Sequence, residues 1–204
     1  MNRLCWWLGP GCMCTLLLSG SSGCGGAKLN QPNVDTHGAA VKAFEQYDTN
    51  GDGLLTEDEL ASCPGMLLFR KEYDINGDGI SLAELEKRLE LLYGKNAAGL
   101  MRVNCELTSR GRPLASAKVR FVPESFLGDS VKTAVGETDQ NGEARIAIPD
   151  DQLPESDRGL SVMQAGIFRV EIEHPKLTDQ EKKFGWEVSG LTRVGDTPQI
   201  DIGG

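Results

Sequence analysis

The 204-residue chain has few of the side chains on which most catalytic and nucleic-acid sites depend. Only two histidines occur, His37 and His174, so a histidine-based zinc site or a Ser-His triad is nearly excluded. The net charge is −9, and we expect no nucleic-acid partner because phosphates carry the same sign. Aromatic residues make up 6 % of the chain, which fits small hydrophobic cores better than one large enzyme core. The composition therefore favours cations as ligands.

Cysteine is scarce outside the first 24 residues, which hold four of the six in the chain. Only Cys63 and Cys105 remain, and two cysteines do not make a disulfide framework. The sequence leaves open whether these two form one bridge or stay as buried free thiols.

The N-terminus has the layout of a secretory signal over residues 1–23, with one basic residue, no acid and a short apolar stretch. That stretch is far shorter than the roughly 20 residues of a membrane-spanning helix. Small residues stand directly before Cys24, an arrangement that resembles the lipobox of bacterial lipoproteins. The resemblance implies that Cys24 carries a lipid anchor, with residues 24–37 as a flexible tether. Soluble secretion and an uncleaved segment are the alternatives.

Two acidic segments repeat 26 residues apart, at residues 48–59 and 74–84. Each has oxygen-bearing side chains at alternate positions and a glycine in sixth place, where the backbone must turn sharply. Calcium prefers six to eight oxygen ligands, and a chain that turns around the ion presents every second side chain to it. Both segments resemble EF-hand calcium loops, and helical apolar patterns flank them.

The first loop matches every position of the EF-hand pattern. Its expected ligands are Asp48, Asn50, Asp52, the carbonyl of Leu54, Thr56 and Glu59. The second loop is one residue shorter, and its expected ligands are Asp74, Asn76, Asp78, the carbonyl of Ile80 and Glu84. We expect weaker or distorted calcium binding there. The alternative is a pair of turns without metal, because Asp, Asn and Gly favour turns by themselves.

The two loops are expected to pair within one EF-hand unit at residues 38–95. Leu55 and Ile80 are the aliphatic residues expected to join them in a short antiparallel ladder, and Pro64 is expected to end the helix after the first loop. Twelve acidic and six basic side chains lie in residues 37–95, so calcium should stabilise the unit by neutralising it. A single methionine, Met66, disfavours a sensor with a methionine-rich groove and favours a structural site.

From residue 99 onward the apolar pattern alternates, as in β-strands. Seven such stretches predict an immunoglobulin-like sandwich at residues 99–204, so the expected fold class is α + β in separate domains. The stretches 111–121, 136–142 and 166–170 resemble the carboxypeptidase regulatory-like, or prealbumin-like, family. The resemblance implies a non-catalytic accessory domain. Trp186 alternates with other apolar residues and is expected in the core.

These observations predict an exported, lipid-anchored calcium-binding protein with a structural, adhesion or scaffolding role at the cell envelope, in the outer membrane or facing the periplasm. The expected partners are calcium ions, the membrane, and envelope proteins or polysaccharide. Because no nucleophile stands beside a base in any motif, we expect no enzyme. A calcium-responsive regulator and an enzyme with structural calcium are the alternatives.

Overall fold

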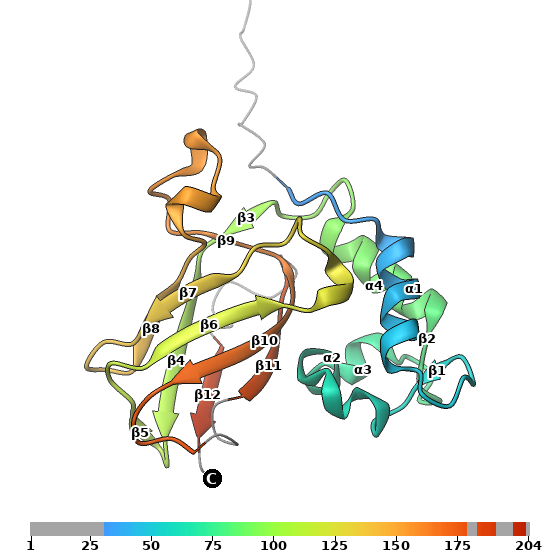
Figure 1. Cartoon of the computed structure of the whole chain (residues 1–204), viewed down its shortest axis with the longest axis horizontal. Helices are drawn as coiled ribbons and strands as arrows, with labels where there is room; N and C mark the ends of the chain where they lie inside the picture. Colours follow the sequence, from blue (N-terminus) through green and yellow to red (C-terminus); the bar gives the residue numbers. More distant parts are fainter. Residues whose placement is uncertain (1–30, 179–182, 191–197, 203–204) are drawn as a thin grey trace, which may run out of the picture.

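The chain is described here by a computed structural model that covers residues 31–178, 183–190 and 198–202. The predicted secretory signal and the first half of the tether, residues 24–30 with Cys24, lie outside these residues, and the last two residues of the predicted tether, Thr36 and His37, already belong to the first helix. A helical segment comes first and a β segment follows, so the structure is mixed α/β (Figure 1), as the change of apolar period predicts. No helix in the described part of the chain is long and apolar enough to cross a membrane.

The helical segment consists of two long helices with short helices and strands between them. Helix α1 (Thr36–Tyr47) begins at Asp35, whose carboxylate accepts the Gly38 N–H at 3.0 Å, and it packs on helix α4 (Leu82–Tyr93). Between them lie β1 (Leu54–Leu55), η1 (Glu59–Ser62), α2 (Pro64–Leu68), α3 (Arg70–Tyr73) and β2 (Ile80–Ser81). Pro64 lacks the N–H that would continue η1, and the new helix starts there, which confirms the predicted stop.

Seven strands occupy the places of the seven predicted alternating stretches. They are β4 (Val103–Ser109), β6 (Lys118–Pro123), β7 (Ala134–Glu137), β8 (Glu143–Ile146), β10 (Gly166–Glu173), β11 (Lys183–Val188) and β12 (Gln199–Ile202). The remaining described elements are short: β3 (Leu100–Met101), β5 (Arg112–Pro113), β9 (Met163–Gln164), η2 (Ser125–Leu127), η3 (Asp150–Gln152) and η4 (Glu155–Asp157).

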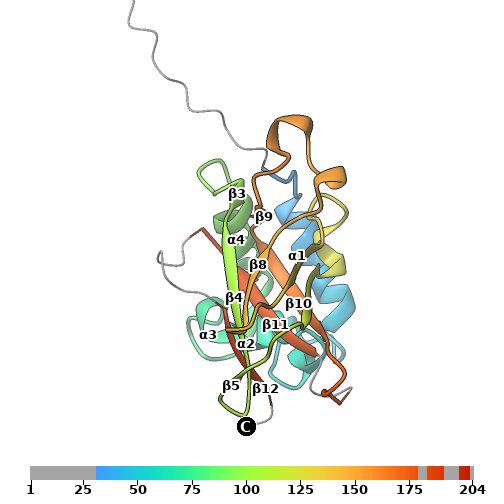
Figure 2. The same ribbon diagram turned by 90° about the vertical axis from the view of Figure 1, so that its left-hand side faces the viewer.

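The strands form two main sheets, seen from the side away from the helices in Figure 2. One has the antiparallel order β11-β10-β6-β7. In the other, β4 pairs antiparallel with β5 and β8 and parallel with β12. A bridge between Val135 and Ala147 joins the two sheets, and the buried rings of Phe121 and Phe168 pack edge to face at 5.9 Å. The immunoglobulin-like topology stays a prediction.

The helical segment packs directly on the sheet that contains β10 and β11. Helix α2 approaches β11 so closely that a Cβ atom on Gly185 would overlap the backbone of Pro64 and Gly65. A Cβ on Gly65 would lie 2.8 Å from the Ile167 side chain of β10. The buried side chains of both segments belong to one hydrophobic cluster. The division into separate domains therefore stays a prediction, since the two segments share this cluster.

The two cysteines outside the N-terminal region are free and buried. Burial raises the pKa of both the Cys63 and the Cys105 thiols to about 12, so both stay protonated at neutral pH. Of the two possibilities that the sequence leaves open, the structure has the pair of free thiols.

The contact between Gly185 and Pro64 gives a direct test of this packing. We expect Gly185→Ala to lower the free energy of unfolding by on the order of 2 kcal/mol, because the added methyl group forces α2 away from β11. Glu173→Ala, at an exposed site of β10, is the control and should change stability by less than about 0.5 kcal/mol. Urea denaturation measures both, and equal effects of the two substitutions would contradict the packing.

Glu124 is a buried carboxylate where α1 meets the β segment, with 3 % of the residue exposed. Its Oε2 accepts a hydrogen bond from the Tyr47 hydroxyl at 3.2 Å, whereas its Oε1 has no hydrogen-bond partner among the residues that the structure describes. Burial raises the pKa of this carboxyl, and Arg169 and the Tyr47 hydroxyl oppose the rise in part. Because the folded pKa lies above the unfolded one, Glu124 lowers stability as the pH rises through that interval.

Replacing Glu124 by glutamine should therefore stabilise the protein at neutral pH. The glutamine side chain would keep an acceptor for Tyr47 and remove the buried charge, so we expect a gain of about 1 kcal/mol at pH 7. The gain should shrink at about pH 4, below the ordinary glutamate pKa and so further below the raised one, where the native carboxyl is mostly protonated. Thermal unfolding at the two pH values measures this, with the exposed Glu137→Gln as control. A gain independent of pH would contradict the role of the charge.

Candidate metal centre

The first loop, residues 48–59, runs from the end of α1 into η1 and folds around its own oxygen-bearing side chains. Asp48 accepts the N–H groups of Gly51 at 2.7 Å and of Gly53 at 3.1 Å. Asn50 accepts the Asp52 N–H at 2.8 Å, and Asp52 accepts the Leu54 N–H at 2.9 Å. Gly53 has a φ of +81°, which only glycine adopts without strain, as the sharp turn of an EF-hand loop requires.

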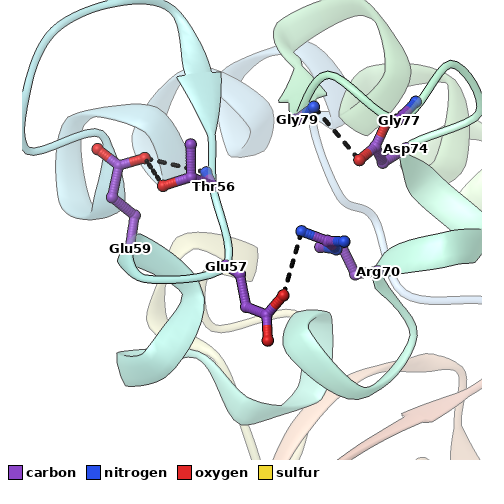
Figure 3. Close-up of polar contacts among 7 residues, drawn as sticks. All are labelled: Thr56, Glu57, Glu59, Arg70, Asp74, Gly77 and Gly79. Atoms are coloured by element: carbon purple, nitrogen blue, oxygen red, sulfur yellow. Dashed lines mark hydrogen bonds and ion pairs between the residues drawn. The ribbon is translucent and has the colours of Figure 1, made fainter.

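Glu59 brings the end of the first loop back to its start, and its contact with Thr56 is drawn in Figure 3. Its Oε2 accepts the Thr56 N–H at 2.9 Å and the Thr56 hydroxyl at 2.8 Å, and its Oε1 accepts the Thr49 N–H at 3.0 Å. The Thr56 backbone and hydroxyl, followed by the Thr49 and Asn50 N–H groups, lower the pKa of Glu59 to about 2. Glu59 is therefore ionised at neutral pH, as a cation ligand must be.

The second loop, residues 74–84, repeats this arrangement although it is one residue shorter. Asp74 accepts the N–H groups of Gly77 at 2.6 Å and of Gly79 at 3.2 Å. Glu84 accepts the Ser81 hydroxyl at 2.7 Å and the Ser81 N–H at 2.9 Å, which lower its pKa, and it also accepts the Ile75 N–H at 3.3 Å. Glu84 thus reaches the start of its loop as Glu59 does.

The two loops pair through β1 and β2, which are antiparallel. Leu55 lies opposite Ile80 and Leu54 opposite Ser81, and the side chains of Leu55 and Ile80 are fully buried. This confirms the predicted ladder. The register aligns Ile80 with the eighth position of the first loop, so the residue missing from the second loop is the counterpart of Leu54. The shorter loop therefore lacks the residue that offers the seventh-position carbonyl, and Ile80 as a carbonyl ligand stays a prediction.

The donors of both loops are all oxygens, which fits a hard cation such as calcium. Within residues 31–178, 183–190 and 198–202, no three His, Cys, Asp or Glu side chains are grouped closely enough to hold a metal by themselves. An EF-hand loop does not depend on such a group, because it combines carboxylates with amide, hydroxyl and carbonyl oxygens. The first loop has an oxygen donor available at each of these positions, whereas the second lacks the seventh-position residue, so the ligand sets of both loops stay predictions.

One exposed ion pair joins the first loop to the helix that leads into the second. Glu57 Oε2 lies 3.5 Å from Arg70 Nη1 of α3 (Figure 3). Glu57 is largely exposed, so solvent screens this pair and it contributes little to stability. The loops are held together by the β1–β2 ladder rather than by this contact.

The residue before each loop is a tyrosine that binds a buried glutamate of the β segment. Tyr47 donates its hydroxyl to Glu124, and Tyr73 donates its hydroxyl to Glu187 of β11, which also pairs with Arg88 of α4. The sequence pattern does not predict these contacts, since Glu187 reads as the polar face of a strand and Arg88 as part of a solvated helix face. The available signal is the tyrosine that stands before the first aspartate of both repeats.

Comparison with known families supports the chemistry of the first loop. Residues 41–64, which span most of α1, the first loop and the turn after it, match the EF hand family. No curated protein and no solved structure matches the chain. The match supports an EF-hand that binds calcium at the first loop.

Ser81 links the second loop to α4 and gives a test of the local geometry. Its hydroxyl accepts the Glu84 N–H while the Glu84 carboxylate accepts the Ser81 N–H, so the two residues form a capping box. We expect Ser81→Ala to lower the free energy of unfolding in calcium-free buffer by about 1 kcal/mol. The exposed Ser62→Ala serves as control. Chemical denaturation measures both, and a loss no larger than that of the control would contradict the cap.

Proposed function

We propose that the protein is an exported, lipid-anchored calcium-binding protein in which calcium has a structural role at the cell envelope. The observation that carries this proposal is the pair of acidic loops joined by the β1–β2 ladder, the first of them within an EF-hand match. The ligands would be the side chains of Asp48, Asn50, Asp52, Thr56 and Glu59 with the Leu54 carbonyl, and in the second loop those of Asp74, Asn76, Asp78 and Glu84 with the Ile80 carbonyl.

The packing of the helices supports structural calcium over a sensor. In sensor EF-hands, calcium separates the helices and exposes an apolar groove for a target helix. Here the apolar side chains Leu60, Met66, Leu85 and Leu89 are fully buried, and α2 lies against β10 and β11. Strands of the same chain thus lie against the helices where a sensor would receive its target. Calcium would stabilise this packing of the helices on the strands rather than separate the helices.

Export and anchoring rest on the N-terminal sequence, with Cys24 as the lipidated residue and the residues between it and helix α1 as the tether. Calcium is plentiful outside the cell, so sites with dissociation constants on the order of 10⁻⁴–10⁻³ M would be filled there. The β segment would serve as a non-catalytic, carboxypeptidase regulatory-like module that contacts envelope proteins or polysaccharide. In this role the protein is an adhesion or scaffolding component and not an enzyme.

Calorimetric titration of the purified chain with calcium tests the proposal. We expect two sites, with Glu59→Gln removing the first and Glu84→Gln the second, each by a loss of affinity of tenfold or more, about 1.4 kcal/mol. Glu57→Gln and Glu90→Gln, which neutralise exposed neighbours, should change either affinity by less than about twofold. No binding heat and no rise in melting temperature at millimolar calcium would contradict the proposal.

A further inference from the structure

Glu187 lies on the face of β11 that the helices cover. Its strand partner is Ile167 of β10, and paired residues of neighbouring strands share a face. Ile167 contacts Gly65 of α2, and the residue at position 187 is only 1 % exposed. The neighbours Trp186 and Val188 belong to the opposite face because side chains alternate along a strand. A carboxylate is therefore buried between the sheet and the helical segment, where it needs partners.

Two helices supply those partners. Arg88 of α4 places Nη2 2.5 Å from Oε1 and Nε 3.1 Å from Oε2 of Glu187, so the pair is bidentate. Tyr73, at the end of α3, donates its hydroxyl to Oε2, and burial raises the pKa of this hydroxyl so that it keeps its proton. The Arg88 guanidinium also lies 5.4 Å from the centroid of the Tyr73 ring. We name these three residues the Glu187 clamp.

The clamp holds both ends of the second loop. Tyr73 directly precedes Asp74, the first expected ligand, and Arg88 lies four residues, about one helical turn, after Glu84, the last one. One carboxylate on the sheet thus fixes the separation between the helix that enters the loop and the helix that leaves it. The shorter loop has one residue fewer to adjust, so its ligands depend more on where the two helices lie.

We propose that Glu187 is a positioning residue for the second loop: by holding Tyr73 and Arg88, it keeps the 11-residue loop in a calcium-binding geometry. This inference rests on the proposed function. By thermodynamic reciprocity, calcium in the second loop strengthens the docking of α3 and α4 on the sheet by the same factor as the clamp strengthens calcium binding.

The first loop provides an internal comparison. Its preceding tyrosine, Tyr47, donates to Oε2 of Glu124, but in the described part of the chain Oε1 of Glu124 accepts no hydrogen bond. This loop has its full twelve residues. Because Glu187 contacts the helices on both sides of the second loop, its loss should weaken the second site and leave the first nearly unchanged. A general loss of stability would be expected to weaken both calcium sites and not the second alone.

The experiment is a calcium titration of the full chain in two backgrounds that isolate one loop each. In Glu59→Gln only the second loop titrates, and in Glu84→Gln only the first. Adding Glu187→Gln should weaken the second site by about fivefold or more and the first by less than twofold. Glu171→Gln on β10 is the matched control, because it removes the same charge from a half-exposed site that pairs with Arg120 and Arg169. It should leave both sites unchanged.

Tyr73→Phe keeps the Arg88–Glu187 ion pair and removes one hydroxyl, so it is the second variant for this test if Glu187→Gln does not fold. It should weaken the second site by about twofold to threefold and leave the first unchanged. Unchanged or tighter binding at the second loop in these variants overturns the inference, and so does a Glu59→Gln chain in which the second loop takes no calcium. In that last case a functioning first loop leaves the proposed function standing, whereas a native chain that binds no calcium removes both.

Discussion

The close contact of α2 with β11 is the constraint on which the rest of the structure depends. Gly185 and Gly65 bring the backbones of helix and strand together, and this approach buries Ile167 and Glu187 under the helical segment. Burying Glu187 alone would be costly, because an unpaired charge in an apolar environment loses its hydration. Tyr73 and Arg88 offset that cost, so the packing requires the helices that flank the second loop to stay where they are.

This constraint decides what calcium can do in the molecule. The acidic loops attract cations, but the helices around them are already fastened to a sheet, so opening them would break the Glu187 clamp and expose the apolar cluster. Calcium binding that stabilises this packing leaves both the Glu187 clamp and the apolar cluster intact. We therefore regard the proposed calcium sites as structural sites that stabilise the packing of a helical segment on a β segment.

Local patterns predicted much of the structure, and long-range packing explains the remainder. The two loops, their ladder at Leu55 and Ile80, the stop at Pro64 and the seven strands follow from turn residues and apolar periodicity. Glu187 escapes such prediction because an acid alternating with Trp186 and Val188 reads as the solvent face of a strand. That face is buried only because helices about 100 residues earlier cover it, and periodicity carries no information on such distant contacts.

Hydrogen exchange of the full chain, with calcium and with a chelator, tests whether calcium in the loops stabilises the packing of the helices on the sheet. If calcium stabilises this packing, it slows amide exchange in both loops and also in β10 and β11, which lie under the helices. Slowed exchange confined to residues 48–59 and 74–84, with β10 and β11 unchanged, would contradict the claim.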